Sequence, residues 1–222
     1  MLMVGGAMGV LMAMVFINIH RYGPMIEFLS VWLNACVDAA VLWVISILYS
    51  RAMTDELTGV SNRRALFHRL YKQINKSRKS HTPSALIVID VDKFRQYNSN
   101  YGHLTGDRVL RAVASVIKTC VRKGDLVGRW GGEEFAILLP HTSLADAHVI
   151  AERLRVQVEG LELDPDGSTM ASRKLGITIS VGVAFTDTSR VDATSLIRNA
   201  DIAMYRAKVK NNCVVIVTDP LH

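Results

Sequence analysis

Residues 126–139 read LVGRWGGEEFAILL, and this stretch decides the fold. Its two ends, residues 126–129 and 135–139, are apolar runs of the length of short strands. Between them, Gly131 and Gly132 permit a tight reversal of the backbone. The stretch therefore predicts an antiparallel β-hairpin that carries Glu133 and Glu134 at its tip.

A second pair of acidic residues follows another predicted strand upstream. Residues 84–90 read SALIVID, an apolar run typical of a buried strand, and Asp92 comes two positions after Asp90. Side chains alternate along a strand, so Asp90 and Asp92 share one face. If this strand neighbours the hairpin, three or four carboxylates converge. Such a cluster repels itself unless a hard divalent cation such as Mg²⁺ or Mn²⁺ is bound.

Carboxylates that hold metal ions at a sheet edge are typical of enzymes that transfer phosphoryl or nucleotidyl groups. The alternative is that the same residues cap a strand end and a turn in solvent, and the residues alone leave both interpretations open. The sequence contains no Gly-Lys pair and therefore no Walker loop. Any nucleotide would have to be held in another way.

The region after Arg51 alternates helical and strand patterns, with no linker rich in Pro, Gly or Ser. This alternation predicts one α+β domain over residues 51–222, with helices packed on a sheet. Helices are predicted at residues 62–79, 106–123, 144–158 and 195–208, and further strands at residues 175–185 and 214–217.

Residues 1–50 form a separate and strongly apolar region. Hydrophobic residues make up 50% of the chain, and the excess is concentrated here. Residues 1–19 carry no charge and residues 31–49 carry only Asp38. A helix over either stretch spans about 28 Å, close to the thickness of the hydrocarbon core of a bilayer. We therefore predict two transmembrane helices, at residues 1–19 and 31–49, joined by a tight loop at residues 20–24.

Two alternatives for this region are a cleaved signal peptide and a pair of core helices in a soluble protein. Residues 1–19 have no basic start and no evident cleavage site, and the apolar character runs all round each segment. Membrane spans are therefore favoured. Basic residues after the second span predict an inner (cytoplasmic) membrane location with the domain in the cytoplasm. The lack of a basic residue before the first span leaves open that the chain is the tail of a larger membrane protein.

The charge balance narrows the class of partner. Residues 1–50 contain one of the 26 basic residues and two of the 20 acidic residues, so the remainder has a net charge of +7. This charge suits nucleotides, nucleic acid or anionic lipid headgroups, and does not choose among them. Cys36, Cys120 and Cys213 lie far apart and form no metal-binding spacing.

Further motifs accompany the hairpin in a fixed order. They are Asp55-Glu56-Leu57-Thr58-Gly59, Asn62-Arg63-Arg64, Asp90-Val91-Asp92-Lys93-Phe94, Asn98, Tyr101-Gly102-His103, Gly106-Asp107, Gly128-Arg129-Trp130-Gly131-Gly132-Glu133-Glu134-Phe135, Ser180-Val181-Gly182-Val183, Ala200-Asp201 and Tyr205-Arg206-Ala207-Lys208. Each motif alone is weak, but together they resemble the GGDEF-domain diguanylate cyclases in the GGEEF spelling, from Asp55 to about Cys213.

The resemblance implies a palm-like domain, with a central and mostly antiparallel sheet flanked by helices. It implies an enzyme that condenses two GTP into cyclic di-GMP plus pyrophosphate. Asp90, Glu133 and Glu134, with the backbone carbonyl of Val91, would bind Mg²⁺ or Mn²⁺, two ions per active site. Glu133 or Glu134 would be the base that takes the proton from the attacking 3′-hydroxyl.

The resemblance also assigns residues to the substrate. Asn98 and Asp107 would hydrogen-bond guanine, because a carboxylate accepts from the N1 and N2 groups that adenine lacks. His103 would line the same pocket. Gly131-Gly132 would let the backbone approach the phosphates, and Lys208 would hold the triphosphate.

An inhibitory product site is a further implication of the family. Arg122 and Asp125 have the Arg-X-X-Asp form just upstream of the signature, and Arg153 falls where a further arginine of that site would lie. Arginine can grip guanine or phosphate through two hydrogen bonds. The alternative interpretation is a helix end with a solvated charge pair.

Three departures from the family pattern bear on the rate. Arg95 takes a catalytic position where the family usually has lysine, and Ser99 replaces a common aspartate. The sequence Asn211-Asn212-Cys213 lacks the triphosphate-binding arginine expected at Asn212, for which Lys210 is a substitute.

Because one domain supplies one half-site, the working form is expected to be a homodimer on a lipid bilayer, with no nucleic acid partner. The main rival is a non-catalytic receptor for GTP or cyclic di-GMP that signals through its membrane segment. A different nucleotide cyclase is disfavoured by Asn98 and Asp107.

Overall fold

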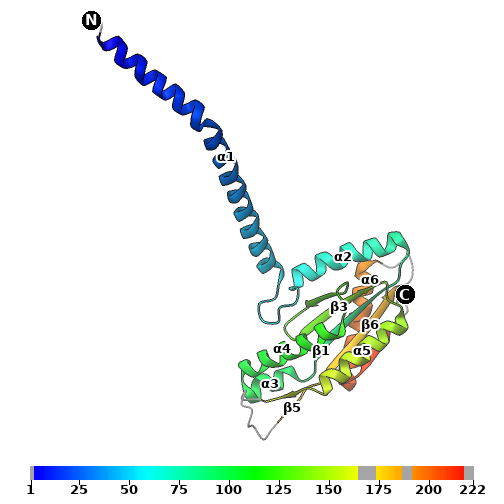
Figure 1. The fold of residues 1–222 in the computed structure, drawn as a ribbon. Coiled ribbons are helices and arrows are strands. Elements are labelled where there is room, and N and C mark those ends of the chain that lie inside the picture. The colour runs from blue at the N-terminus through cyan, green and yellow to red at the C-terminus, as the bar shows by residue number, and fades with distance from the viewer. Residues whose placement is uncertain (1–2, 165–173, 187–191, 218–222) are drawn as a thin grey trace. The chain divides into compact units, whose positions relative to one another are not determined.

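A computed structural model describes residues 3–164, 174–186 and 192–217 (Figure 1). The chain forms two compact units, Met1–Ala52 and Met53–His222. The first unit is the helix α1 (Met3–Met53). The outer ends of the predicted ranges, residues 1–2 and 218–222, lie outside the described residues.

The predicted pair of transmembrane helices with a loop at residues 20–24 is wrong, because α1 continues through Gly23 and Pro24. Proline has a helical φ and removes one backbone donor, while the flanking hydrogen bonds continue the helix cooperatively. The α1 ribbon bends part-way along its length (Figure 1), as proline-containing helices do. Within the described residues, a single segment, Glu27–Met53, is long and apolar enough to cross a membrane.

The second unit is built on a five-stranded sheet with the order β2-β3-β1-β6-β7. The central strand β1 pairs antiparallel with β3 and β6, β2 pairs antiparallel with β3, and β6 pairs parallel with β7. The predicted α+β fold with a mostly antiparallel sheet is therefore confirmed. The strands are β1 (Ser84–Val91), β2 (Leu126–Arg129), β3 (Glu134–Pro140), β6 (Ile179–Thr186) and β7 (Val214–Val217).

Helices cover both faces of this sheet. Along β1, Leu86 and Val88 pack under α2 (Arg63–Ser80) and α6 (Ala193–Lys210), whereas Ile87 and Ile89 pack under α4 (His103–Cys120) and α5 (Leu144–Glu159). Every residue of β1 is buried, which explains why its sequence is a continuous apolar run. The run ends at Asp90, so the first polar side chains appear at the edge of both cores.

Several boundaries differ from the predicted ones. The short helix α3 (Phe94–Tyr101) was not predicted, and α4 begins three residues earlier than expected. Gly102, with φ of 78°, separates these two helices, a conformation that costs glycine little. The predicted strand at residues 175–185 is divided into β5 (Leu175–Gly176) and β6, and β5 pairs with β4 (Glu162–Leu163) in a small separate sheet.

Candidate active site

The carboxyl end of β1 and the hairpin tip lie side by side. In the sheet, Asp90 is the register partner of Glu134 on β3 and of Ser180 on β6. The Val91 N–H donates to the backbone carbonyl of Glu133 at 3.2 Å. The predicted convergence of the two acidic motifs is therefore what the strand pairing produces, because β1 and β3 are neighbours.

The hairpin turn is held in place from two sides. Within it, the Trp130 N–H donates to the Glu134 carbonyl at 2.8 Å, and the Trp130 ring stacks on Phe67 of α2 with centroids 4.5 Å apart. Arg129, at the end of β2, donates to the Gly132 carbonyl at 2.6 Å and forms an ion pair with Asp55, outside the hairpin, at 3.2 Å. Glu133 is thereby carried on a fixed loop.

The Asp55–Arg129 pair was not predicted, although both residues lie in the motifs quoted above. Thr58 donates to Asp55 Oδ1 through its backbone N–H at 2.9 Å and through its hydroxyl at 2.5 Å. Burial opposes the charge of Asp55, but the bonds from Thr58 and the nearby Arg129 outweigh it and lower the pKa of this carboxyl. The pair ties the segment after α1 to the signature loop.

Asp90 is a deeply buried charged residue of the site. Its side chain is 2% exposed, and its Oδ2 accepts from Lys208 Nζ at 2.8 Å. Its Oδ1 is buried and has no hydrogen-bond partner in the described part of the chain. Burial, and to a smaller extent the neighbouring Glu133 and Asp92, raise the pKa of Asp90 despite the contact with Lys208.

Lys208 responds to the same charges in the opposite sense. Burial opposes its positive charge, but Asp90, Glu133 and Glu134 outweigh this effect and raise the pKa of its ammonium group. Glu134 also acts on Asp201 of α6, whose pKa is raised by burial and by this neighbouring carboxylate. Lys208 is therefore a firmly charged cation among three acidic residues.

A cleft of 410 Å³ opens beside these residues. Lys93, with φ of 55°, precedes α3 and turns that helix along the cleft. The predicted catalytic Arg95 lies on the wall, and so does Ser99. The lining is Asp90, Val91, Lys93, Phe94, Arg95, Gln96, Ser99, Asn100, Glu133 and Lys208.

The Asp92 carboxylate is already hydrogen-bonded within the protein and is therefore not available as a metal ligand in the predicted carboxylate cluster. Its carboxylate accepts from the hydroxyls of Thr178 at 2.7 Å and Ser180 at 2.5 Å, and from the Asn212 N–H at 2.8 Å. It is 1% exposed, so these three donors satisfy a buried charge. Alternation placed Asp92 on the same face as Asp90, but its partners come from Thr178 and Ser180 at the start of β6 and from Asn212 just after α6.

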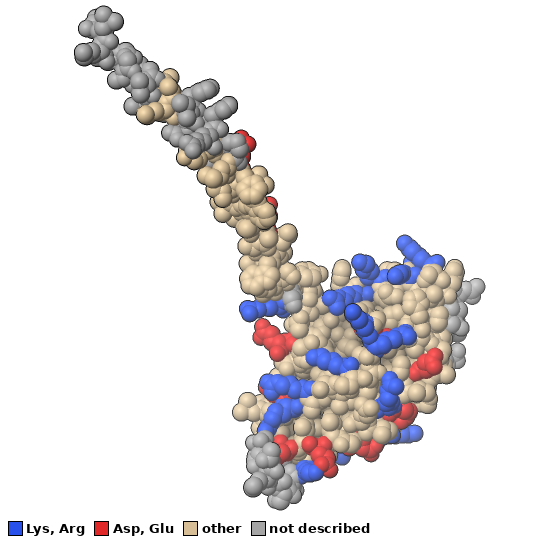
Figure 2. All heavy atoms as spheres, in the orientation of Figure 1, with Lys and Arg blue, Asp and Glu red and all other residues tan. Residues whose placement is uncertain are grey.

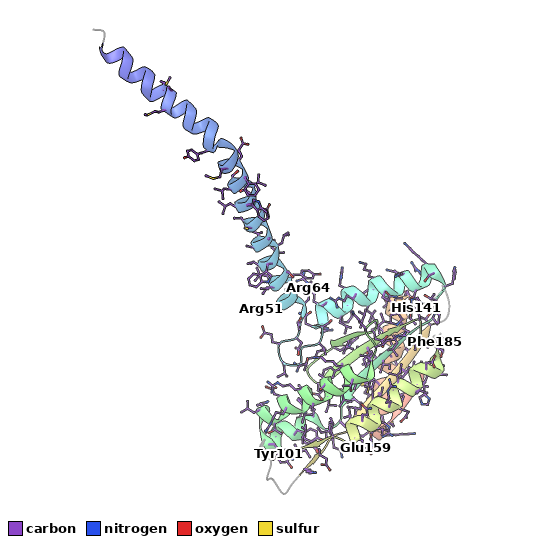
Figure 3. All side chains as sticks on the ribbon, in the orientation of Figure 1. Arg51, Arg64, Tyr101, His141, Glu159 and Phe185 are labelled. Carbon is purple, nitrogen blue, oxygen red and sulfur yellow. The ribbon has the colours of Figure 1, made fainter. Side chains whose placement is uncertain are left out.

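Asn212, where the family pattern suggests an arginine, joins the same network. Its side chain accepts from Arg155 at 3.0 Å and donates to Glu159 at 2.7 Å, both on α5. Glu159, labelled in Figure 3, lies in the last turn of that helix. In the structure Asn212 therefore links the end of α6 to α5 and Asp92.

The predicted guanine-binding residues lie on α3 and α4. A Cβ placed on Gly106 would meet Asn98 Oδ1 at 2.0 Å, so the Asn98 side chain rests on the glycine that precedes Asp107. His103 is exposed at the start of α4, and Asp107 is half-buried. These three residues do not line the cleft that holds Asp90, although Phe94 and Ser99 of the same α3 do.

The two signature glycines differ. A Cβ on Gly131 would meet Glu134 Oε2 at 2.2 Å, whereas a Cβ on Gly132 would have no described atom within 4 Å. Gly131 is therefore required by the packing of Glu134 within the hairpin. Gly132 is exposed, and no described atom would obstruct a side chain at this position.

The fit of a divalent cation depends on the donors present. Among the described side chains, no three from His, Cys, Asp and Glu form a cluster close enough to hold a metal ion unaided. However, Asp90 Oδ1 is a buried acceptor without a donor, and Glu133 lines the same cleft. These hard oxygen atoms suit Mg²⁺ or Mn²⁺ that is also held by the phosphates of a nucleotide.

The predicted inhibitory residues share a second cavity. Arg122, Asp125 and Arg153 all line a pocket of 340 Å³ between the ends of α4, β3 and α5. Arg122 is an ion-pair partner of Asp125 at 3.2 Å and also donates to Thr142 at 3.0 Å. Arg153 donates to the Cys120 carbonyl at 2.6 Å.

Several known proteins are similar to this chain in sequence and in fold. The family described as "Diguanylate cyclase, GGDEF domain" matches residues 52–213. Diguanylate cyclase A of Treponema denticola is 36% identical over 178 residues, which cover 79% of this chain and 47% of that protein. The chain spans less than half the length of the curated relatives that it matches.

Two solved structures extend the likeness. The GGDEF domain of DgcB from Caulobacter crescentus, in complex with c-di-GMP, has a TM-score of 0.70 and 34% identity, covering 74% of this chain and 93% of that one. The active GGEEF domain of a diguanylate cyclase from Vibrio cholerae has a TM-score of 0.63 and 28% identity, covering 70% and 96%. By sequence, fold and the placement of its signature loop, this chain belongs to the GGDEF diguanylate cyclase family.

Proposed function

We propose that this chain is a diguanylate cyclase that joins two GTP molecules into cyclic di-GMP. The observation that carries this proposal is the 410 Å³ cleft in which Asp90, Glu133 and Lys208 meet. The Vibrio cholerae domain, described as active, has the GGEEF spelling that Gly131-Gly132-Glu133-Glu134-Phe135 has here.

Asp90, Glu133 and the Val91 carbonyl would hold a divalent cation, with Glu134 in a supporting position. Mg²⁺ or Mn²⁺, two ions per active site, would polarise the α-phosphate and neutralise the charge that develops on it. The unpartnered Asp90 Oδ1 supports this assignment, since a buried acceptor without a donor is costly unless a ligand meets it.

The reaction forms two phosphodiester bonds and releases two pyrophosphates. Each 3′-hydroxyl attacks the α-phosphorus of the other GTP, and the bond to the β-phosphate oxygen breaks. Glu133 or Glu134 accepts the hydroxyl proton. Lys208, kept charged by its acidic neighbours, and Arg95 on the cleft wall counter the negative charge of the leaving pyrophosphate.

Guanine is recognised at α3 and α4. Asp107 accepts from the guanine N1 and N2 groups, and Asn98 supplies the complementary amide. His103, exposed at the start of α4, closes the same pocket. Gly131-Gly132 lies where the triphosphate passes, and the open space beyond Gly132 leaves room for it.

Two features of the assembly complete the proposal. Each domain holds one GTP, so two copies of the chain face each other in the working form. The domain, residues 51–222, lies in the cytoplasm, and α1 anchors it in the inner (cytoplasmic) membrane through Glu27–Met53, whose most apolar window has a mean hydropathy of 2.0. Nucleic acid is not a partner.

Product inhibition is proposed at the second pocket. Arg122 and Arg153 offer guanidinium groups and Asp125 a carboxylate, which suit the phosphates and guanines of cyclic di-GMP. The DgcB domain, solved in complex with c-di-GMP, shows that a relative binds this product. Added cyclic di-GMP should therefore slow synthesis by the wild type, and Arg153→Ala should weaken this inhibition while Arg111→Ala, on the exposed side of α4, should not.

The decisive test is an incubation of the purified full chain in detergent with GTP and Mg²⁺ or Mn²⁺, with products identified by mass. Cyclic di-GMP is expected from the wild type and should be lost in Glu133→Gln. Nucleotide binding without product in the wild type would contradict the cyclase proposal. That result would favour a receptor for GTP or cyclic di-GMP, the candidate supported by the engagement of Asn212 with α5 in place of a triphosphate-binding arginine.

A further inference from the structure

The outer side of α2 is an unusually basic surface. The helix carries seven Lys or Arg residues and no acidic residue in 18 positions. Its inner side packs on the sheet through Leu66, Leu70 and Ile74. In Figure 2 blue side chains gather along α2, and Arg64 is labelled at its beginning in Figure 3.

Four of these residues form one stripe along the helix, here called the basic face: Arg69, Lys72, Lys76 and Lys79. Their spacing of three, four and three residues places them on the same side of an α-helix. All four are exposed, and none forms an ion pair with a residue that the structure describes. Like charges at this spacing repel, so the stripe weakens the isolated helix and is stabilised by an external anion.

The surface beside the basic face is hollowed. Lys72, Lys76 and Lys79 line a depression of 560 Å³ together with Asn75 and Ser80. The polar groups of these five side chains, beside the hollow, are donors that suit a phosphate ester. A row of such donors along a straight helix suits an array of phosphates in a plane better than one small molecule.

Chain length relates this helix to α1. The candidate span ends at Met53 and α2 begins at Arg63, so nine residues connect them. Nine extended residues reach at most about 30 Å. If α1 is inserted in a bilayer, as proposed above, α2 lies within that distance of the membrane surface, where the headgroups of an anionic leaflet attract lysine and arginine.

We propose that the basic face of α2 binds the anionic headgroups of the bilayer in which α1 is anchored. The contact holds one side of the cyclase domain against the membrane and so limits the orientations in which two domains meet. This inference rests on the proposed membrane anchor, but not on the cyclase activity, because α2 contributes no residue to the cleft.

The test uses the full chain reconstituted in nanodiscs of phosphatidylglycerol with phosphatidylcholine, compared with phosphatidylcholine alone. Lysine acetylation followed by mass spectrometry reports the exposure of Lys72, Lys76 and Lys79 directly, and Lys123 and Lys210 serve as internal controls. The three α2 lysines should be modified about fivefold more slowly in the anionic nanodiscs. About 1 M salt should remove this protection, because the Debye length falls to about 3 Å.

A variant pair tests the effect on the domain. Hydrogen exchange of α2 amides should differ between the two lipid compositions in the wild type and in Arg111→Gln/Lys123→Gln/Arg198→Gln. It should not differ in Lys72→Gln/Lys76→Gln/Lys79→Gln, which removes the same number of charges.

Equal acetylation in both nanodiscs, with the chain still resistant to alkaline carbonate, would overturn the lipid contact and leave the membrane anchor standing. Release of the chain by carbonate would overturn the anchor, and this proposal with it. Protection of the three lysines by duplex DNA or RNA but not by anionic nanodiscs would assign the face to nucleic acid instead. Synthesis of cyclic di-GMP, measured separately in detergent, tests the cyclase proposal without reference to the lipid contact.

Discussion

At the scale of single residues, the burial of Asp90 lowers the stability of the free protein but suits the proposed binding of a cation. It is 2% exposed, one of its oxygens has no described donor, and burial raises its pKa above the ordinary value of 3.8. A carboxyl whose pKa is raised by folding costs stability at every pH above that ordinary value, because its charged form is better solvated in the unfolded chain. Such a cost is reasonable where a cation is to be bound.

Asp90→Asn should therefore stabilise the free protein and abolish synthesis. The melting temperature at pH 7 without metal should rise by about 2–4 °C, the change that about 1 kcal/mol produces in a domain of this size. Differential scanning calorimetry measures it. With GTP and Mn²⁺ the order should reverse, since only the wild type gains stability from the ligand. An Asp90→Asn protein that melts below the wild type without metal would contradict this interpretation.

Asp55 has the opposite pH dependence. Its pKa is lowered, so the charged carboxylate stabilises the fold above the ordinary value of 3.8, and this contribution disappears as the pH falls through the folded pKa. In urea titrations, Asp55→Asn should be less stable than the wild type at pH 7, and the difference should shrink at and below about pH 3.8.

The neighbouring exposed Glu56→Gln is the matched control for Asp55→Asn and should show little change in stability at either pH. Because Asp55 holds Arg129, and Arg129 holds the Gly132 carbonyl, Asp55→Asn should also lower kcat. A stability difference that is the same at pH 7 and below pH 3.8 would show that the ion pair is not the cause.

At the scale of elements, β6 and α6 approach each other closely at Gly182. A Cβ on this residue would lie 2.1 Å from the Met204 backbone nitrogen and 2.4 Å from the Ala200 carbonyl oxygen. Both contacts are backbone atoms of α6, the helix that also carries Asp201 and Lys208. The position of Asp201 and Lys208 therefore depends on residue 182 being a glycine, because any Cβ there would push α6 away from β6.

Gly182→Ala should force α6 away from β6. The expected loss is about 3 kcal/mol in the free energy of unfolding, within the range found for overpacked cores. Urea unfolding followed by circular dichroism measures it. Gly176→Ala, where no described atom lies within 4 Å, is the control and should cost little. Equal losses in the two variants would mean that α6 does not pack on β6 as closely as described.

Gly106 in α4 offers a second test at this scale. In an exposed helix, Gly→Ala stabilises by about 1 kcal/mol, yet here the new methyl would collide with Asn98 Oδ1 at 2.0 Å and with Phe94 at 3.1 Å. We expect Gly106→Ala to displace Asn98 and to raise the KM for GTP more than it lowers kcat. Gly124→Ala, with no described atom nearby, should leave both constants unchanged.

At the scale of the whole molecule, the two units have different relations to solvent. The core of the second unit is assembled within Met53–His222, whereas α1 exposes large apolar side chains such as Trp32, Leu33, Leu42 and Trp43. An apolar surface of this extent is not stable in water and marks a contact with lipid or protein.

The full chain should therefore need detergent or lipid to remain dispersed, while residues 53–222 should be soluble and unfold cooperatively by themselves. Size-exclusion chromatography and calorimetry of both chains test this expectation. A full chain that stays dispersed without detergent would contradict an exposed α1. Synthesis by residues 53–222 should rise more steeply than linearly with protein concentration, because two copies are needed for one product.

Much of the fold was predictable because local patterns and tertiary packing agree. Apolar runs gave β1 and the hairpin, and Asn62 caps α2 where that helix was predicted to begin. The predictions failed where local signals were ambiguous. Gly23-Pro24 suggested a loop, but the helical hydrogen bonds around it continue, and α3 was missed because its eight residues are too few to show a helical period.

The sequence by itself determined the family, the main strands and helices of the domain, and the identity of the acidic, basic and glycine residues of the site, because these depend on residue type and spacing. Only the tertiary structure decided how they are used. Pairing of β1 with β3 and β6 brought Asp90 to Glu134, and sent Asp92 to Thr178, Ser180 and Asn212. Among the described residues, Asp90 therefore keeps an oxygen free for a ligand, whereas the carboxylate of Asp92 is fully hydrogen-bonded. The difference comes from donors that lie far away in the chain, which local sequence patterns do not reveal.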